Sequence, residues 1–359
     1  MLIMANKSIR EPSPELHARM SRIAPDHFEF DRLSRGRHVV FDRSGFTEFN
    51  VSVANSPEHS PALKAAMKRG DLQVVNHDYV EQLSHTHSRF HGLLHDAGIR
   101  VPPTVIQVSG KRFFIGKKLP VESTLWVKKV SFDKEGRFLG HRGAGVSIFV
   151  PKKQDEVLPT HDHEFYQQFI VPPDDYLKDI RVYVVGNKII PGYVRTAKKP
   201  LTRANYSGLY PPNEDQFVTA EHPGKVTLLE GELAQKVVAE AEKVRKAFIE
   251  RLRIPKSEWN KQPMFGFGSM DFLLDANGEP VICEFDTSPE IRDIGGLRDK
   301  LANEMADHLA KQAGTSGTVH IVGDKRNDFI AKVLVHLKKR LDKSRISHKQ
   351  PLHQVALGV

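Results

Sequence analysis

Three carboxylates that lie close together in the sequence offer the hard oxygen ligands that a divalent cation binds. Asp271 precedes an Asn-Gly turn at 277–278, and Glu284 and Asp286 follow the turn. In a hairpin closed there, Asp271 and Glu284 lie opposite each other, and the two-residue spacing puts Glu284 and Asp286 on one face of their strand. Mg²⁺ binds a few such oxygens and completes its shell with water and substrate phosphates. The residues alone leave two interpretations open, a metal site and a solvated acidic strand face.

A glycine-rich segment, Gly-His-Arg-Gly-Ala-Gly-Val at 140–146, has the composition of a phosphate-binding loop. Gly140, Gly143 and Gly145 would let backbone N–H groups approach an anion, and Arg142 adds positive charge. No Gly-Lys-Ser/Thr follows, so the segment is not a Walker A loop. A tight hairpin is the alternative interpretation.

A lysine pair precedes this segment on a strand expected at 125–130. Lys128 and Lys129 are adjacent, so they lie on opposite faces of the strand, and one of them would point into any cleft. A lysine ammonium in that position can hold a nucleotide phosphate as a point charge. The alternative is that both lysines are exposed to solvent.

The strand expected at 165–171 and the residues after it suit a nucleoside. The strand edge can read an adenine through its backbone groups, and Asp174 or Asp175 can bind ribose hydroxyls. Arg181, Arg195 and Arg203 follow, and their guanidinium groups can fork onto phosphate or carboxylate oxygens.

The composition limits the class of protein. The chain has 359 residues, 39% hydrophobic and 27% charged, which is an ordinary globular balance for two or three modest domains. No apolar run approaches the roughly 20 residues of a membrane helix, and the polar first 29 residues lack a signal-peptide core, so we expect neither membrane insertion nor secretion. The single cysteine, Cys283, argues against a disulfide framework and fits a reducing cytoplasm. The net charge of +9 suits a polyanionic partner such as a nucleotide, an acidic carrier or nucleic acid.

The hydrophobic pattern divides the chain into segments. Strand-like and helix-like stretches alternate up to residue 104, which is typical of a small parallel α/β layer. Successive strands with hairpin turns follow, and long helices are expected at 231–252 and 297–312. We therefore predict an α/β (α+β) chain with a flexible leader (1–35), an N-terminal α/β domain (36–104), a first lobe (105–170), a second lobe with the metal site (171–312) and a basic C-terminal appendage (313–359).

Taken in order along residues 70–312, these motifs resemble the ATP-grasp superfamily, and within it the carboxylate–amine ligases of the ribosomal-protein glutamate ligase and glutathione synthetase type. Six stretches carry the likeness: Gly98–Thr104, the glycine segment with His141 in place of a family serine, Gln167–Ile170 (Gln-Gln-Phe-Ile), Asp179–Arg181 (Asp-Ile-Arg), Arg203–Gly208 (Arg-Ala-Asn-Tyr-Ser-Gly) and Glu284–Pro289 (Glu-Phe-Asp-Thr-Ser-Pro). In the last stretch Asp286 stands where the family usually has Asn. The resemblance implies an ATP-grasp fold, in which two α+β lobes clamp the nucleotide after a small Rossmann-like α/β domain.

The resemblance also implies roles for individual residues. The ATP phosphates would be held by Lys128 or Lys129 and by the glycine segment with Gly140, Arg142, Gly143 and Gly145. The adenine would contact Gln168, Phe169 and Ile170, and the ribose Asp174 or Asp175. One or two Mg²⁺ ions, or Mn²⁺ in their place, would be held by Asp271, Glu284 and Asp286. The transferred phosphoryl group and the acyl phosphate would be neutralised by Arg181, Arg195 and Arg203.

The family reaction joins a carboxylate to an amine. ATP phosphorylates the acid, and the amine then attacks the acyl phosphate to give an amide, ADP and phosphate. The implied substrates are small-molecule or peptide acids and amines in the cytoplasm, and the sequence leaves open whether the chain forms a homo-oligomer or docks an acidic carrier. Two other functions stay open: an ATP-grasp kinase that phosphorylates a hydroxyl, and a basic nucleic-acid-binding protein. The lack of an arginine-rich run with interleaved aromatics disfavours the last.

Overall fold

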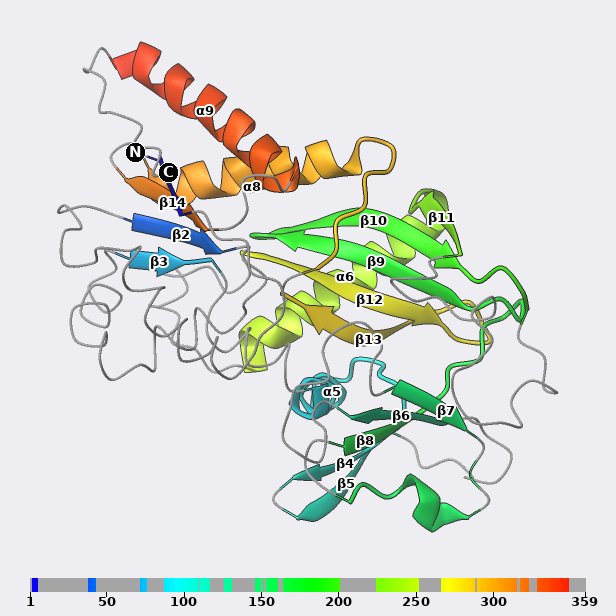
Figure 1. The fold of residues 1–359 in the computed structure, drawn as a ribbon. Helices are drawn as coiled ribbons and strands as arrows, with labels where there is room; N and C mark the ends of the chain where they lie inside the picture. The colour runs from blue at the N-terminus through cyan, green and yellow to red at the C-terminus, as the bar shows by residue number, and fades with distance from the viewer. Residues whose placement is uncertain are drawn as a thin grey trace.

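The structure is a computed structural model, and it arranges three β-sheets and four α-helices among the residues it describes (Figure 1). These residues are 2–5, 38–42, 72–75, 87–108, 110–116, 126–130, 146–149, 151, 153–160, 164–200, 224–251, 266–287, 289–314, 317–322 and 328–348. No helix among them is both long enough and apolar enough to cross a membrane.

A five-stranded antiparallel sheet, which we call the central sheet, has the order β11-β10-β9-β12-β13. Its strands are β9 (Lys178–Val185), β10 (Lys188–Thr196), β11 (Lys225–Leu228), β12 (Phe267–Leu274) and β13 (Pro280–Asp286). Tight turns close the two hairpins, and Gly186 (φ 58°) and Gly278 (φ 72°) supply the left-handed backbone that they require. The hairpin predicted around the Asn-Gly turn is therefore confirmed.

The two faces of the central sheet are covered by different helices because strand residues alternate between faces. Val182, Met270 and Phe272 pack against α6 (Gly231–Arg251) and α5 (His87–Asp96). Tyr183 and Phe267 point to the other face, which packs against α8 (Leu297–Ala313). The long helices predicted at 231–252 and 297–312 are thus present, and each buries an apolar stripe on the sheet.

A second antiparallel sheet, which we call the lid sheet, has the order β5-β4-β8-β6-β7. Its strands are β4 (Thr104–Val108), β5 (Lys111–Ile115), β6 (Trp126–Val130), β7 (Val146–Phe149) and β8 (Glu164–Gln168). The short helix η2 (Gln154–Val157) packs on one face through Val157, next to Trp126 and Tyr166. The opposite face carries Phe165 and lies against α5, which sits between the two antiparallel sheets in Figure 1.

The third sheet is parallel and has the order β1-β14-β2-β3. Its strands are β1 (Leu2–Ala5), β2 (His38–Asp42), β3 (Leu72–Val74) and β14 (Thr318–Val322). It joins residues from three predicted segments, since β1 lies in the expected leader and β14 in the expected appendage. Helix α9 (Asp328–His348) follows β14 and packs on α8 (Figure 1). The parallel pairing agrees with the expected parallel layer, whereas a Rossmann-like arrangement stays a prediction because the segments that connect β1, β2 and β3 lie outside the described residues.

Candidate active site

Four strands of the central sheet place a row of polar side chains on one face. Tyr193 of β10 pairs in register with Arg181 of β9, Arg181 pairs with Asp271 of β12, and Asp271 pairs with Glu284 of β13. Residues in register share a face and lie about 5 Å apart between neighbouring strands. The sheet therefore brings together residues that are up to about a hundred positions apart in the sequence.

The centre of this row is a buried ion pair. Arg181 donates from Nε to Asp271 Oδ1 at 2.7 Å and from Nη2 to Asp271 Oδ2 at 2.6 Å. The two residues are 7% and 5% exposed. Burial lowers the pKa of Arg181, but the Asp271 carboxylate outweighs it and raises this pKa well above its ordinary value. The pair is thus a fixed fork that joins the two side chains at two points.

A second buried pair lies beside the first. Arg195 of β10 donates from Nε to Asp179 Oδ2 at 2.7 Å, and its Nη2 bonds to the same oxygen. The Tyr193 ring lies between the two guanidinium groups, with its centroid 5.9 Å from Arg181 Cζ and 6.0 Å from Arg195 Cζ. Burial and then the nearby Asp271 charge raise the pKa of Asp179, against the opposing effect of both arginines. Two arginines and two aspartates thus form one closely balanced cluster.

The chain segment after β13 lies over this cluster. The carbonyl oxygen of Glu290 accepts hydrogen bonds from Tyr183 Oη at 2.7 Å and from Arg181 Nη1 at 3.4 Å. Within the described residues, the buried hydroxyls of Tyr193 and Ser269 have no hydrogen-bond partner. Buried polar atoms are nearly always paired with protein, water or ligand, so these hydroxyls mark places that suit a polar molecule.

The three predicted metal ligands share the face but do not form one group. Asp271 faces Glu284 across the hairpin, and Ser269 faces Asp286. Within the described part of the chain, no set of three acidic, histidine or cysteine side chains is close enough to hold a metal ion. Asp271 is instead committed to Arg181 through both carboxylate oxygens. Glu284 and Asp286 are half-buried on the outer strand of the sheet and carry the hard oxygens that Mg²⁺ prefers, so the donor chemistry fits this ion.

A β-bulge at Cys283 explains why Glu284 lies on this face. The pairing shifts between Asp271 and Phe272, whose partners are Glu284 and Ile282. The extra residue lets Ile282 and Phe285, three positions apart, both enter the core under α6. Cys283 Sγ donates to the Asp271 carbonyl oxygen at 3.2 Å and braces the bulge.

The lid sheet carries a polar cluster of its own around Glu164, which is 2% exposed. Glu164 Oε1 accepts from Lys128 Nζ and from Tyr166 Oη at 3.0 Å. Glu164 Oε2 accepts from the Thr160 backbone N–H at 2.6 Å and from Thr160 Oγ1 at 2.8 Å. Burial raises the pKa of Glu164, but the hydrogen bonds from Lys128 and Thr160 outweigh it and lower this pKa to about 2. Sequence reasoning missed Glu164; the available signal was an acid in a strand whose other residues are largely apolar or amide.

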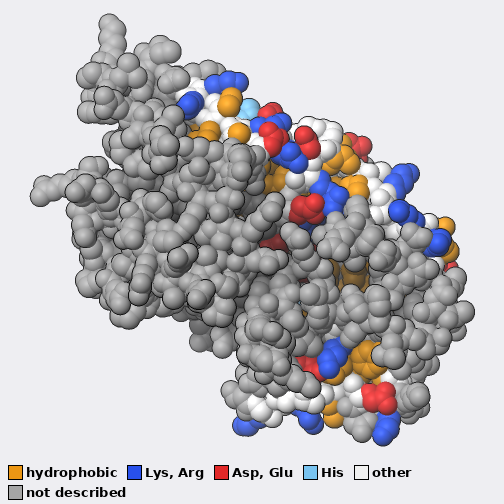
Figure 2. Space-filling view, in the orientation of Figure 1, with side chains coloured by type: hydrophobic (Ala, Val, Ile, Leu, Met, Phe, Trp, Pro, Cys, Tyr) orange, Lys and Arg blue, Asp and Glu red, His pale blue; other side chains and the backbone are white. Residues whose placement is uncertain are grey.

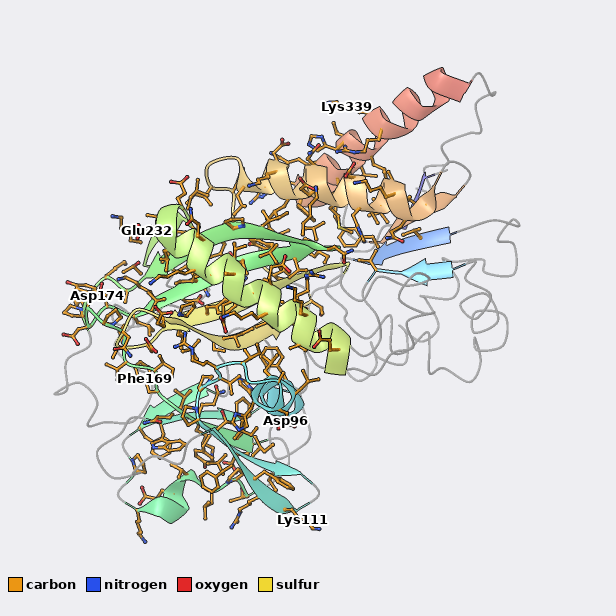
Figure 3. All side chains as sticks on the ribbon, turned by 180° about the vertical axis from the view of Figure 1, so that it is seen from behind. Asp96, Lys111, Phe169, Asp174, Glu232 and Lys339 are labelled. Atoms are coloured by element: carbon orange, nitrogen blue, oxygen red, sulfur yellow. The ribbon has the colours of Figure 1, made fainter. Side chains whose placement is uncertain are left out.

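The predicted adenine contacts lie where the lid sheet meets the rest of the molecule. Gln168 ends β8 and donates its backbone N–H to Pro103 O at 2.8 Å. Phe169 and Ile170 follow the strand rather than belong to it, because the two prolines at 172–173 have no N–H to continue a ladder. Figure 3 labels Phe169 between the two antiparallel sheets.

The two predicted ribose ligands differ in their surroundings. Asp174 is ion-paired with Lys178, and it lies beyond Phe169 at the end of the central sheet in Figure 3. Asp175 is exposed and has a left-handed backbone at φ 60°, which is uncommon for a residue other than glycine. Aspartate adopts this region more readily than most residues, and the choice between the two aspartates stays a prediction.

Several predicted site residues are not tested by this geometry. Arg203 and the whole glycine segment, with Gly140, Arg142, Gly143 and Gly145, lie outside the described residues. Lys129 belongs to β6 and is opposite Phe165 in register, but its side chain also lies outside the description. Their roles stay predictions.

Comparison with known proteins found similar solved structures. No protein-family model matches the sequence, and no curated protein matches it. A D-alanine–D-alanine ligase from Bacillus anthracis is 12% identical, with a TM-score of 0.47 over 94% of this chain and 98% of the ligase. The ATP-grasp ligase PsnB, solved with a minimal precursor, is 13% identical, with a TM-score of 0.42 over 86% of this chain and 98% of PsnB. An L-amino acid ligase from Bacillus licheniformis is 13% identical, with a TM-score of 0.36 over 71% of this chain and 68% of that ligase.

Proposed function

We propose that the protein is an ATP-dependent ligase that joins a carboxylate to an amine through an acyl phosphate and releases ADP and phosphate. The observation that carries the proposal is the cross-strand row of Arg181, Asp271 and Glu284, with the Arg195–Asp179 pair beside it. Phosphoryl transfer needs little covalent help from a protein and depends on positioning and charge neutralisation. A row that places guanidinium groups beside carboxylates is suited to both tasks.

The nucleotide would bind between the lid sheet and the central sheet. Gln168, Phe169 and Ile170 would contact the adenine at the junction, and Asp174 or Asp175 the ribose. Lys128 would hold a phosphate from the lid side, with the glycine segment closing over the others. We also propose that Glu284 and Asp286, with Asp271 behind them, would hold one or two Mg²⁺ or Mn²⁺ ions. A bound ion would neutralise phosphate charge and bring the phosphates to the row.

The chemistry of the two steps assigns the remaining charges. In the first step a substrate carboxylate oxygen attacks the γ-phosphorus, the bond to the bridging oxygen breaks, and ADP leaves. In the second step the amine attacks the acyl carbon, phosphate leaves with the former carboxylate oxygen, and the amine loses a proton to give the amide. Negative charge builds on the phosphoryl oxygens in the first step and on the acyl oxygen in the second. Arg181 and Arg195, which are already oriented by Asp271 and Asp179, would stabilise that charge without reorganising.

An ADP-release screen over candidate acids, with hydroxylamine present and without it, tests the proposal. A hydroxamate product would demonstrate an acyl phosphate and support the ligase. ADP formed together with a phosphorylated alcohol would instead support a kinase. If no acid, alcohol or peptide gives ADP release and Mg–ATP does not bind, the proposed function is wrong. We also propose that the reaction takes place in the cytoplasm.

A further inference from the structure

Glu164 has no assigned role in the proposed ligase reaction, yet it is buried in the lid sheet with both carboxylate oxygens bonded. Both oxygens of Glu164 are used, Oε1 by Lys128 and Tyr166 and Oε2 by two donors of Thr160. Lys128 differs from its partner because its side chain is 35% exposed whereas that of Glu164 is 1% exposed. The pair is thus anchored at the acid and accessible at the base.

Strand register places Lys128 on the face of the lid sheet that carries Trp126 and Tyr166, opposite the face that lies against α5. Lys128 is opposite Tyr166, and two residues earlier Trp126 is opposite Gln168, so Lys128 and Gln168 share a face of the lid sheet. Lys129 is opposite Phe165 in the backbone register. Of the two adjacent lysines, Lys128 is therefore the one on the side of a predicted adenine contact.

We propose that Glu164 is a positioning residue that holds the ammonium group of Lys128, through Oε1, in one place and in its charged form for binding a nucleotide phosphate. The proposal rests on the proposed function. A lysine side chain has four rotatable bonds and is otherwise a mobile point charge. Hydrogen bonds to Glu164 and Tyr166 still leave one N–H donor of the ammonium group for a phosphate oxygen. Tyr166 assists, because its ring lies 5.5 Å from Lys128 Nζ and its hydroxyl bonds to the same carboxylate oxygen.

The cluster also explains how a partly buried lysine keeps its proton. Burial lowers the pKa of Lys128, but hydrogen bonds and charge from Glu164 and Tyr166 outweigh this effect and raise it above the ordinary value. Glu164 and Tyr166 of β8 are the titratable groups that face Lys128 among the described residues. Without the carboxylate, the effect of burial would remain and the pKa of Lys128 would fall.

The test compares Glu164→Gln with the native protein by calorimetric titration of Mg–ADP, whose phosphates are fully ionised above pH 7. Native affinity should change little between pH 7.5 and 9.5. The Glu164→Gln variant should bind several-fold more weakly at pH 7.5 and lose about a further ten-fold by pH 9.5, as Lys128 deprotonates. Glu164→Asp should restore part of the high-pH affinity, because it returns the carboxylate at shorter reach.

A matched control removes a Lys–Glu pair outside the site. Lys188 of β10 bonds to Glu304 of α8, so Glu304→Gln deletes the same kind of charge from a half-buried position outside the site. Its Mg–ADP affinity should follow the native pH profile. A native pH profile in Glu164→Gln as well would overturn the proposal, whereas absence of Mg–ADP binding by the native protein would overturn the proposed function.

A measurement on the native protein keeps the proposal testable if Glu164→Gln does not fold. Acylation of lysines by acetic anhydride, mapped by mass spectrometry, reports the deprotonated amine at each position. Lys128 should react slowly up to pH 10 and be protected further by Mg–ADP. Lys188, which is paired with Glu304 outside the site, should react at a rate that Mg–ADP does not change. Fast reaction of Lys128 near pH 9, or nucleotide protection of Lys129 alone, would contradict the assignment.

Discussion

The central sheet and the lid sheet both bury acids against bases, but they shift the pKa of those acids in opposite directions. Asp179 lies in a cluster with a second carboxylate, and burial and Asp271 raise its pKa. Glu164 accepts hydrogen bonds at both oxygens, has no second carboxylate beside it among the described residues, and has a pKa lowered to about 2. Two acids that are buried to a similar degree can therefore have pKa values shifted in opposite directions. Hydrogen-bond donors lower the pKa of a buried acid, whereas a second acid nearby raises it.

The two sheets also differ in the base. The central sheet uses arginines, whose planar forks bind carboxylates at two points and cannot be deprotonated. The lid sheet uses a lysine that is held at one point and is partly exposed. The arginines are thus held in place by their own carboxylates, whereas the lysine keeps its ammonium group partly open to solvent.

Removing an arginine from the central cluster should have the largest effect. Arg181→Met leaves Asp271 buried without its partner and close to Asp179. We expect the free energy of unfolding to fall by about 3–5 kcal/mol, as is typical when one member of a buried pair is lost. Urea denaturation followed by circular dichroism measures it. The surface variant Lys178→Met, which breaks the pair with the half-exposed Asp174, should change stability by less than about 1 kcal/mol. Equal effects of the two variants would contradict the buried-pair interpretation.

The two outer carboxylates of the row should differ in their effect on rate. Glu284→Gln keeps the shape but deletes a charged ligand, and ADP formation should slow on the order of 10²–10³-fold if the metal supplies about 3–4 kcal/mol of transition-state stabilisation. Asp286→Asn keeps one oxygen ligand and introduces the usual residue of the resembled family, so it should retain much of the activity at higher Mg²⁺. Magnesium titrations of ADP release compare the two. Full activity of Glu284→Gln would remove this hairpin from the metal site.

The buried acids of the two sheets should change the pH dependence of the free energy of unfolding in opposite directions. An unfolded glutamate titrates near 4.5 and folded Glu164 near 2, so between these values the unfolded state binds more protons and the free energy of unfolding falls as the pH falls. The contribution is complete above pH 4.5. Glu164→Gln should therefore show a shallower loss of stability between pH 4.5 and 2 than the native protein in urea denaturation. Asp179 contributes with the opposite sign because its pKa is raised, so Asp179→Asn should not flatten this acid limb.

The smallest effect is expected at the contact that joins the two regions. Arg100, at the entry to the lid sheet, donates from Nη1 to Asp275 Oδ2 and from Nη2 to Pro280 O, both at 3.1 Å, in the β12–β13 hairpin. The Arg100 side chain is 45% exposed, so Arg100→Gln should reduce stability by about 0.2–1 kcal/mol. Thermal denaturation at low and high salt measures the change, and the difference from native should shrink in salt. A loss above about 2 kcal/mol would mean that this contact holds the two regions together.

The C-terminal segment predicted to be basic has part of its positive charge paired with acidic side chains. Arg340 of α9 bonds to Asp307 of α8, and Arg298 of α8 bonds to Asp328 at the start of α9. Along the upper edge of the view in Figure 2, basic and acidic side chains lie side by side rather than as a patch of one sign. Part of the charge counted in the sequence is therefore neutralised between helices, and docking of an acidic carrier stays a prediction.

The local sequence pattern was sufficient to predict the two long helices and the hairpin that carries Asp271 and Glu284. The Asn-Gly turn, the alternation around Asp271 and Glu284, and the helical periodicity at 231–252 and 297–312 all depend on neighbours within a few residues, and the structure confirms them. The sequence also put Arg181 and Asp271 among the site residues. It predicted that Arg181 would neutralise the phosphoryl group and that Asp271 would bind the metal ion.

Only the tertiary structure decided which charges meet. Register across four strands joins Arg181 to Asp271, and pairing of β6 with β8 joins Lys128 to Glu164. A strand's pattern reports which face a residue takes but not which strand lies beside it, because strand order depends on long-range packing of whole sheets. For the same reason the sequence could not foresee that β14, near the end of the chain, lies between β1 and β2. The residue types were set by the sequence, and their partners were set by sheet topology.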